Sequence, residues 1–294
     1  MADYSPDVLH RLWAVEKNIY TEFARICDKH GLRYFCAYGT TLGAIRHKGF
    51  IPWDDDMDMG MPRADYEKFL EIAPSELGEH FELLEARRTP GYVLPFAKLT
   101  RSDTTFVEAT DQDRTYHSGI FIDIFPFDLI WEDAQRREKA EHKCWLLARL
   151  CVLSAYKKPK LPSGMAGWKR AVAYFGCGVV HYALRLCGQT PKKLHERYVA
   201  AACTPAKEGA KGLYADFVSY RLEDNYGQVD VTYTAECLFP TVQVPFDEIM
   251  AAVPQDWDTY LKYTFGDYMT LPPEDKRHCH FPAKLCFSND EVTV

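Results

Sequence analysis

A short run of acids that alternate with methionine, Asp54-Asp55-Asp56-Met57-Asp58-Met59, constrains the fold of this chain more than any other feature. Successive side chains of a β-strand point to opposite faces, so Asp56 and Asp58 would share one face while Met57 and Met59 lie in the core. Two carboxylates so close repel each other unless a cation lies between them, and Mg²⁺ prefers hard oxygen ligands with retained water. The run therefore predicts a strand that carries part of a divalent metal site.

These acids have two other interpretations. A solvated acidic turn would not need the apolar neighbours Ile51, Trp53 and Met57 that flank the run. A calcium loop of the helix-loop-helix kind needs Gly at the sixth position from Asp54 and Glu at the twelfth, where this chain has Met59 and Asp65. The divalent metal site is therefore the favoured interpretation.

A further carboxylate, Asp123, lies in the middle of the apolar stretch Gly119 to Pro126. This stretch predicts a buried strand, and an isolated buried carboxylate is costly, so Asp123 needs a cation or hydrogen-bond donors as a partner. The metal is the economical partner. A role in capping a turn, or a pairing of Asp123 with an arginine, stays open.

The pattern along the chain predicts strands and helices in alternation, followed by a mainly helical middle. Ser5 and Pro6 are typical of a helix start, and apolar residues recur at helical spacing from there to Gly31. The Gly39-Thr40-Thr41 sequence is expected to break a strand before a short helical turn, and Pro62 is expected to open a helix. Strands are expected at residues 33–38, 81–84, 96–100, 119–125, 213–220 and 236–244, and helices at 42–46, 133–156, 167–187 and 191–206.

Composition excludes some classes of function. The chain has 294 residues and a net charge of −7, so it has no overall basic field to hold a nucleic acid, and we expect no nucleic-acid partner. Ten cysteines are scattered without a CxxC pair, which favours reduced thiols. The N-terminal residues lack the layout of a secretory signal, so we expect a cytoplasmic protein.

One apolar segment, Ala171 to Cys187, bears on membrane contact. It is too short for a clean span and contains His181 and Arg185, so a spanning helix is not expected. Lysines and arginines flank the segment on both sides, which leaves two interpretations, a buried core helix or a helix at the membrane surface. The protein is thus expected to be cytoplasmic, with loose peripheral contact at the inner membrane face as the alternative.

These motifs resemble the nucleotidyltransferase superfamily, in which a Gly-Ser/Thr turn precedes an Asp-x-Asp strand and a later third carboxylate. Three longer segments resemble the LicD family of phosphotransferases more specifically: GTTLGAIRHKGFIPWDDDMDMGMPRADYEKF, GIFIDIFPFD and FGDYMTLPPEDKRHCH. The resemblance extends from about Lys29 to His280. It implies an α/β (α+β) fold in which a nucleotidyltransferase-like mixed β-sheet core is flanked by helices and carries a helical insertion. The expected division is a catalytic core at 1–130, the helical insertion at 131–210, and a C-terminal part at 211–294 that completes the catalytic domain.

The resemblance also implies roles for the acids and for the turn before them. Asp56 and Asp58 would hold Mg²⁺, which Mn²⁺ could replace, against the diphosphate of a CDP-linked donor. Asp123 would complete this catalytic and metal site and could take the proton of the acceptor hydroxyl. Gly39 and Thr40 would let the backbone approach the phosphates.

Other candidates are less specific. Asp54 is a second-tier metal ligand if the strand begins early, whereas Asp55 is expected to be solvated or bonded to its own loop. A basic cluster and three polar residues of the family motifs could bind the donor phosphates or nucleotide, although solvated charges or lone salt bridges would look the same. These candidates are Arg46, His47, Lys48, Lys98, Arg277 and His280.

The implied function is a Mg²⁺-dependent transfer of phosphocholine, or of a related phospho-alcohol, from CDP-choline or a similar CDP-alcohol to a hydroxyl of a cell-surface glycan or lipid-linked glycan, with release of CMP. Ethanolamine and ribitol donors would give the same acidic motif, and teichoic acid or lipopolysaccharide could be the acceptor. The alternatives are a nucleotidyltransferase that loses pyrophosphate and an inactive module that binds glycan or nucleotide. A glycosyltransferase is disfavoured because only one helix and one short strand precede Asp56.

Overall fold

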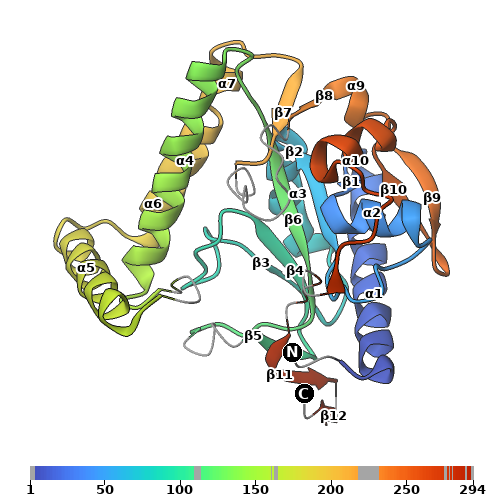
Figure 1. Ribbon diagram of the computed structural model, residues 1–294, viewed down its shortest axis with the longest axis horizontal. Helices are drawn as coiled ribbons and strands as arrows, with labels where there is room; N and C mark the ends of the chain where they lie inside the picture. Colours follow the sequence, from blue (N-terminus) through green and yellow to red (C-terminus); the bar gives the residue numbers. More distant parts are fainter. Residues whose placement is uncertain are drawn as a thin grey trace.

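The computed structural model describes residues 4–108, 114–159, 161, 165–217, 232–274, 277, 279, 281–288 and 290–292. A mixed sheet with the strand order β1-β2-β6-β4-β3 forms its centre (Figure 1). β2 and β6 run parallel, and the other neighbours in this order run antiparallel. The bounds are β1 Phe35–Cys36, β2 Asp58–Pro62, β6 Phe121–Leu129, β4 Ala97–Arg101 and β3 Phe81–Leu84. The mixed sheet flanked by helices confirms the predicted fold class.

The first helix, α1, spans Pro6–His30 and packs across one face of the sheet. Its start and end follow from the sequence, because Ser5 Oγ accepts a hydrogen bond from Val8 N and Gly31 takes the left-handed conformation that ends a helix. Its buried side covers one side of the β-strands. The core on this side of the sheet includes Leu12, Phe23, Met57, Met59, Ile122 and Ile124. The prediction that Met57 and Met59 lie in the core is confirmed.

The opposite face of the sheet carries a second core. Phe125 and Phe127 of β6 point to this side, where Phe35 and Tyr260 join them. Helix α2 (Tyr38–Arg46) and helix α10 (Trp257–Phe265) contact each other over this face. The strand β6 is therefore covered on both sides, which explains its near-continuous apolar sequence.

The segment between β1 and α2 differs from the sequence prediction. Only Phe35–Cys36 is strand, and α2 begins at Tyr38, so Gly39, Thr40 and Thr41 belong to the helix and do not break the chain before it. Gly43 explains the close packing here, because a Cβ at this position would lie 2.5 Å from the carbonyl oxygen of Gly49. The helix α3, Arg63–Glu76, follows Pro62 as predicted.

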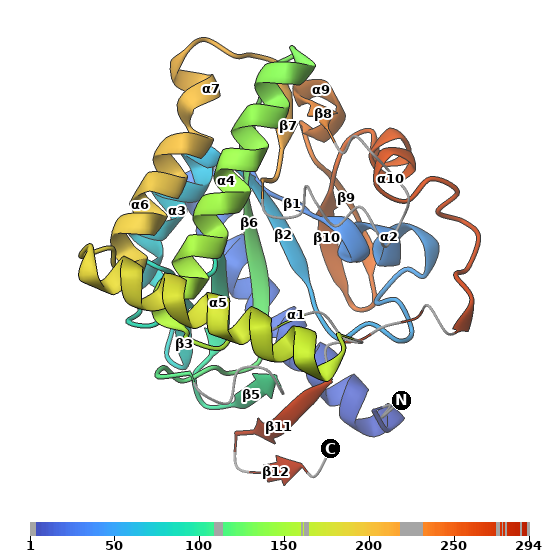
Figure 2. The same cartoon turned by 60° about the vertical axis from the view of Figure 1, so that its left-hand side comes forward.

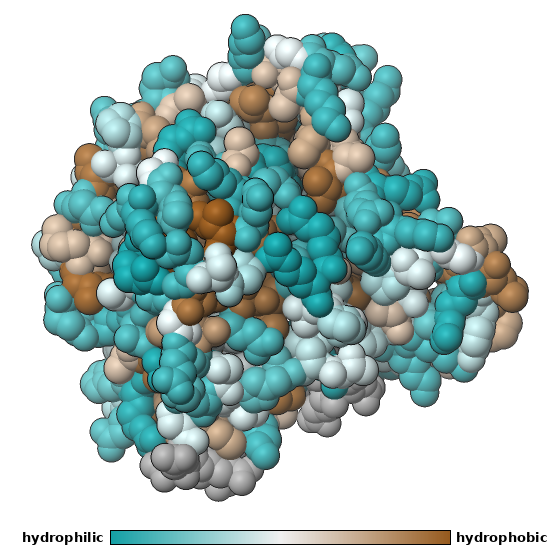
Figure 3. Space-filling view, turned by 180° about the vertical axis from the view of Figure 1, so that it is seen from behind, coloured by the Kyte–Doolittle hydropathy of each residue, from teal (hydrophilic) through white to brown (hydrophobic). Residues whose placement is uncertain are grey.

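The middle of the chain is helical, as predicted (Figure 2). The helices α4 and α6 pack against each other through Cys144, Leu147, Leu194 and Tyr198, and α5 extends from the far end of α4. Seen from behind, the outer end of this projection shows hydrophobic side chains (Figure 3). The bounds are α4 Ala134–Ala155, α5 Gly167–Leu186, α6 Pro191–Ala202 and α7 Thr204–Lys207.

The rest of the chain returns to the sheet and adds two small ones. The strand β7 (Leu213–Ala215) pairs with β6 and with β8 (Tyr233–Thr234). The remaining strands form a hairpin of β9 (Val242–Phe246) with β10 (Ile249–Val253), and a sheet of β5 (Thr105–Glu108), β11 (Pro282–Phe287) and β12 (Asp290–Val292). The division into a core, a helical insertion and a completing C-terminal part stays a prediction.

The predicted strand at 236–244 is wrong in its first half. Thr234 Oγ1 accepts a hydrogen bond from Cys237 N and begins a short helix, α9 (Ala235–Leu238), before β9. Capping by a threonine side chain stabilises this turn of helix, which the apolar pattern alone does not reveal. The ten cysteines are present as thiols and not as disulfides, in agreement with the sequence prediction.

Candidate active site

Asp58 and Asp123 are brought side by side by the parallel pairing of β2 with β6. Asp58 is the first residue of β2, and it lies in register with Asp123 of β6. Residues in register on adjacent strands point to the same face, so both carboxylates lie on the side of the sheet opposite Met57 and Met59. Asp123 is buried and Asp58 is half-buried. The structure thus brings together two acids that the sequence analysis assigned to one site, and their role stays a prediction.

Asp56 and Asp54 lie outside the strand, so the predicted strand position of Asp56 is wrong. The chain from Trp53 to Met57 is irregular, and Trp13 Nε1 donates a hydrogen bond to the carbonyl oxygen of Asp54 at 2.8 Å. The side chain of Asp54 reaches the start of α2, where a Cβ on Gly39 would lie 2.8 Å from Asp54 Oδ2. Gly39 thus gives Asp54 room beside the helix N-terminus.

Thr40 positions Asp58. Its Oγ1 accepts a hydrogen bond from Asp58 N at 2.8 Å, and Ala37 N donates to the carbonyl oxygen of Asp58 at 2.7 Å. The start of α2 is therefore fixed against the start of β2. The resemblance implied that Thr40 allows phosphates to approach the backbone. In the structure the side chain of Thr40 also accepts the hydrogen bond from Asp58 N.

Glu16 and Asp55 belong to the same acidic group, although sequence reasoning missed the first and misplaced the second. Glu16 is only 1% exposed, and burial followed by the charges of Asp56, Asp55, Asp54 and Asp58 raises its pKa well above the ordinary value. Asp55 is buried and accepts a hydrogen bond from Tyr4 Oη at 2.7 Å, so the expectation that it is solvated or bonded within its loop is wrong. An available signal for Glu16 was its place among the apolar positions of α1, next to Leu12 and Ile19 in the buried stripe.

Lys98 is the cationic partner of Asp123. The two residues lie opposite each other on β4 and β6, with 2.9 Å between Lys98 Nζ and Asp123 Oδ1. Lys98 Nζ also lies 3.2 Å from the centre of the Phe121 ring, and both charged side chains are nearly buried. The pairing that sequence reasoning left open for Asp123 is therefore with a lysine, and Lys98 places a positive charge within the acidic site.

Aromatic rings lie close to this ion pair. Tyr92 is buried, and the charge of Asp123 adds to burial in raising its pKa. Its ring centre lies 5.5 Å from that of Tyr116, while Phe96 and Phe125 have ring centres 4.5 Å apart beside Lys98. The hydroxyl of Tyr92 has no hydrogen-bond partner within the described part of the chain.

The predicted basic cluster lies at the other end of α2. Arg46 donates hydrogen bonds to His47 Nε2 at 2.9 Å and to the carbonyl oxygen of Tyr268 at 2.7 Å. Burial and the charge of Arg46 lower the pKa of His47, and burial lowers the pKa of Arg46. Arg277 Cζ lies 4.5 Å from the centre of the Trp53 ring, and the ring centres of His47 and Trp53 are 6.4 Å apart.

The structure thus groups Arg46, His47 and Arg277 around Trp53. Lys48 follows them but is exposed, and its carbonyl oxygen accepts a hydrogen bond from Asp247 N. His280 lies outside the described residues.

The donor set suits Mg²⁺. No three His, Cys, Asp or Glu side chains among the residues described are arranged to hold a metal ion. Mg²⁺ is usually bound by one or two carboxylates, with substrate phosphates and water as its other ligands, so a pair is sufficient. Asp58 and Asp123 provide such a pair. Nearby, Glu16 Oε2 is buried without a hydrogen-bond partner in the described part of the chain, as expected of a group that another ligand can complete.

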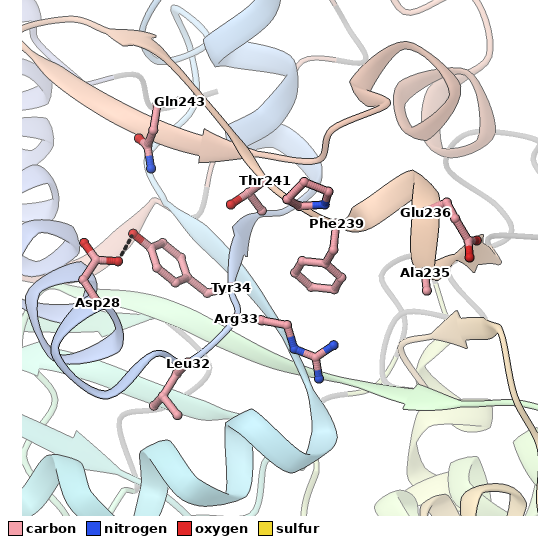
Figure 4. A pocket seen from close by; sticks show the side chains of 10 residues that line it. Asp28, Leu32, Arg33, Tyr34, Ala235, Glu236, Phe239, Thr241 and Gln243 are labelled. Carbon is pink, nitrogen blue, oxygen red and sulfur yellow. Dashed lines mark hydrogen bonds between the residues drawn. The ribbon is translucent and has the colours of Figure 1, made fainter.

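The cavity in Figure 4 is separate from this acidic group. It has a volume of about 510 Å³ and is lined by residues at the end of α1 and just after it, and by residues from α9 to the start of β9, among them Arg33, Tyr34 and Phe239. Arg33 is paired with Asp65 at 2.8 Å, and none of the carboxylates described above lines the cavity.

Comparison with known proteins agrees with the geometry. The family model for "LicD/FKTN/FKRP, nucleotidyltransferase domain" matches residues 31–150, a segment that contains α2, β2, β4 and β6. Residues 31–150 are therefore assigned to the nucleotidyltransferase domain of this family. Asp56, Asp58, Lys98 and Asp123 all lie within its LicD-family segment, whereas Glu16 and Arg277 lie outside it.

Two relatives of this chain show different extents of similarity. The "Lipopolysaccharide cholinephosphotransferase LicD" of Haemophilus influenzae is 27% identical over 267 residues, which cover 90% of this chain and 92% of the relative. An uncharacterized protein of Rickettsia typhi is 32% identical over 113 residues, which cover 37% of this chain and 32% of the relative. The first similarity includes the helical middle as well as the nucleotidyltransferase domain.

Proposed function

We propose that this LicD-family protein transfers phosphocholine, or a related phospho-alcohol, from a CDP-linked donor to a hydroxyl of a cell-surface glycan and releases CMP. The observation that carries the proposal is the register of Asp58 with Asp123 on two parallel strands, beside the buried cation Lys98. The similarity over 90% of the chain to a protein named lipopolysaccharide cholinephosphotransferase supports the choice of phosphocholine and of a glycan acceptor.

The carboxylates would hold a divalent cation. In the proposal Asp58 and Asp123 are the main ligands of Mg²⁺ or Mn²⁺, and Asp56 and Asp54 lie at the edge of the site. When bound, the cation neutralises charge on the donor diphosphate and polarises its phosphoryl oxygens. Glu16 is buried close enough to Asp54, Asp55, Asp56 and Asp58 for their charges to act on its carboxyl group.

The remaining steps belong to the side chains of the protein. The acceptor oxygen attacks the β-phosphorus, the bond from this phosphorus to the oxygen of the α-phosphate breaks, and CMP leaves with that oxygen. Asp123 accepts the proton of the attacking hydroxyl, and Lys98 orients Asp123 through the 2.9 Å contact. Positioning and charge stabilisation provide most of the catalysis in phosphoryl transfer, so few further groups are needed.

Donor binding is assigned to the two ends of α2. The N-terminal turn at Gly39 and Thr40 offers the positive end of the helix dipole to the phosphates. Arg46, His47 and Arg277 around Trp53 would contact the nucleotide, with Lys48 at the rim. These basic groups lie at the C-terminal end of α2, on the loop that follows it and on the C-terminal segment, so they approach the donor from two parts of the chain.

The choline head group would lie among aromatic rings. A quaternary ammonium cannot donate hydrogen bonds and is recognised by the faces of aromatic side chains. Tyr92, Tyr116 and Phe96 lie near Asp123 and are the proposed candidates for this contact. Two other aromatics near the motifs already face a cation, because Arg277 lies over Trp53 and Arg136 lies over Trp131 at 3.6 Å.

The second candidate function is nucleotidyl transfer, which the matching nucleotidyltransferase domain favours. In that reaction the acceptor would attack the α-phosphorus of a nucleoside triphosphate, and pyrophosphate would leave. The two candidates share the acidic site and differ only in the phosphorus attacked and in the product.

Product analysis separates these reactions. Purified protein is incubated with CDP-choline, CDP-ethanolamine, CDP-ribitol or CTP, with and without Mg²⁺ and with a crude glycan extract, and CMP and pyrophosphate are measured by chromatography. Asp7→Asn, a change at an exposed residue of α1, serves as the matched control for substitutions in the acidic site. We expect Mg²⁺-dependent CMP from one CDP-alcohol. Pyrophosphate from CTP, without CMP from any CDP-alcohol, would overturn the proposal in favour of nucleotidyl transfer.

A further inference from the structure

The helix α5 carries a continuous apolar stripe that faces away from the protein. Its large apolar residues recur at intervals of three and four, so they lie along one side of the helix. Phe175 is 76% exposed and Leu186 is 89% exposed. The stripe, hereafter the α5 stripe, consists of Trp168, Val172, Phe175, Val179, Tyr182 and Leu186, and each of these side chains is more than half exposed. Figure 2 shows the whole helix extending along the outside of the molecule.

The packing of α5 leaves this stripe uncovered. Only Gly178 and His181 of the helix are buried, and His181 Nδ1 lies 2.8 Å from the carbonyl oxygen of Leu153 in α4. These two residues hold the opposite side of α5 against the end of α4. A row of six large apolar side chains exposed next to one another is uncommon on soluble proteins and marks a surface that contacts a partner or a membrane.

The charge around α5 indicates which partner fits. Residues 142–195 contain ten lysines and arginines and no aspartate or glutamate, although the whole chain has a net charge of −7. Lys157, Lys158, Lys169, Arg170 and Arg185 are exposed. A strongly positive segment in an acidic protein attracts an anionic surface and repels a second copy of itself.

The basic residues are placed beside the α5 stripe. A rotation of about 100° per residue puts Lys169 on one side of the stripe and Arg185 on the other. Lys157 Nζ lies 5.2 Å from the centre of the Tyr182 ring and donates a hydrogen bond to Tyr182 Oη at 3.4 Å. An apolar stripe with Trp and Tyr, bordered by Lys and Arg, is the pattern of a helix that lies in a membrane interface.

The length and shape of the helices argue against a span. No single helix in the described part of the chain is long and apolar enough to cross a membrane. The pair α5 and α6 passes that test only together and is bent by 93° at its break. The helix α6 is moreover packed on α4 through Leu194 and Tyr198. A position in the membrane surface therefore suits α5 better than a position across it.

We propose that α5 docks the protein on an anionic lipid bilayer. The α5 stripe enters the boundary between head groups and acyl chains, and Lys169, Arg170, Arg185 and the lysines at 157 and 158 contact lipid phosphates. The contact needs both parts, since a short apolar stripe or a few basic residues alone bind membranes weakly.

Vesicle cosedimentation tests this docking without any substrate. Full-length protein is mixed with vesicles of phosphatidylglycerol and phosphatidylcholine, or of phosphatidylcholine alone, at low and high salt. Phe175→Ser with Leu186→Ser removes two apolar side chains of the stripe, and Lys169→Glu with Arg185→Glu reverses its flanking charges. Met250→Ser with Tyr263→Ser and Lys207→Glu with Lys211→Glu are matched changes at exposed residues elsewhere.

We expect binding to the anionic vesicles that weakens with salt, and a partition coefficient that falls by about tenfold or more in each α5 variant while the matched controls keep the wild-type value. Equal binding of wild type and α5 variants would overturn the proposal. Failure of the wild type to bind would overturn it as well. Sedimentation velocity would then test whether the α5 stripe instead pairs two copies of the chain. Such a dimer should dissociate in Phe175→Ser with Leu186→Ser. Because the readout is lipid binding, its failure leaves the proposed transferase activity standing, and thermal unfolding of each variant verifies its fold.

Discussion

Lys98 of β4 and Asp123 of β6 form an ion pair at the centre of the sheet, with 2.9 Å between Lys98 Nζ and Asp123 Oδ1. Lys98 is 3% exposed and Asp123 is 8% exposed. Replacement of Lys98 by Met would leave a buried carboxylate without its cation. We expect Lys98→Met to lower the free energy of unfolding by about 3 kcal/mol, measured by urea denaturation at pH 7 without metal.

A second substitution distinguishes this effect from lost packing. Asp123→Asn in the Lys98→Met background removes the uncompensated charge, so it should recover most of the lost stability. Lys68→Met, at an exposed position of α3, should leave the free energy of unfolding nearly unchanged. The ion pair has no such role if Lys98→Met is as stable as Lys68→Met.

Thr40 holds the start of β2 through the hydrogen bond from Asp58 N to its Oγ1. Valine has nearly the same shape but no acceptor, so Thr40→Val should leave a half-buried N–H unpaired and cost about 1 to 3 kcal/mol in unfolding free energy. Catalysis should fall as well, since Asp58 is no longer fixed. Thr21→Val, at an exposed position of α1, is the matched control. Unchanged stability and unchanged CMP release in Thr40→Val would contradict this role.

Glu16 is buried, and burial, followed by the charges of four nearby aspartates, raises its pKa well above the ordinary value. A neutral side chain of the same size removes this repulsion, so we expect Glu16→Gln to raise the free energy of unfolding without metal by about 1 kcal/mol. Thermal and urea unfolding measure the change, with the exposed Glu71→Gln as control. If Glu16→Gln unfolds more easily than the wild type, Glu16 is instead held by favourable contacts.

The free energy of unfolding should depend on pH through His195 of α6. Burial, and then the charges of Arg87 and Arg63, lower its pKa from 6.5 to about 4, while Glu67 acts in the opposite direction. The unfolded chain therefore takes up a proton near pH 6.5, whereas the folded chain does so only near pH 4. The stability that His195 provides is complete above pH 6.5 and is lost as the pH falls toward 4, by about 3 kcal/mol in total.

Urea denaturation at pH 7.5 and at pH 5 measures this effect. The loss of stability between the two pH values should be smaller in His195→Gln than in the wild type, because glutamine takes up no proton. His142→Gln, on the neighbouring helix α4, is the control. An equal loss in wild type and His195→Gln would show that other groups cause the acid sensitivity.

Features that depend on nearby residues were predictable from the sequence. Ser5, Pro6 and Gly31 set the ends of α1, and the apolar run around Asp123 identified β6. The alternation at Met57 to Met59 correctly placed the methionines in the core and Asp58 on the opposite face.

Features that depend on distant partners were not predictable. The chain at Asp54 and Asp55 is irregular because Trp13 binds the backbone of Asp54 and Tyr4 binds the carboxylate of Asp55, across 41 and 51 residues of sequence. The strand therefore begins only at Asp58, and Asp56 lies before it, outside the alternation of its side chains. The hydrogen bond from Asp58 N to Thr40 Oγ1 likewise depends on the packing of α2 against β2.

The most direct test of the account is CMP formation from CDP-choline by the wild type and by Asp58→Asn, with Mg²⁺ varied from none to saturation in the presence of a glycan acceptor. We predict that the wild type requires Mg²⁺. We also predict that Asp58→Asn unfolds like the wild type but releases CMP at a rate that is lower by about 100-fold or more. Asp7→Asn should behave as the wild type. Turnover of Asp58→Asn within a few fold of the wild type would contradict the assignment of the acidic site.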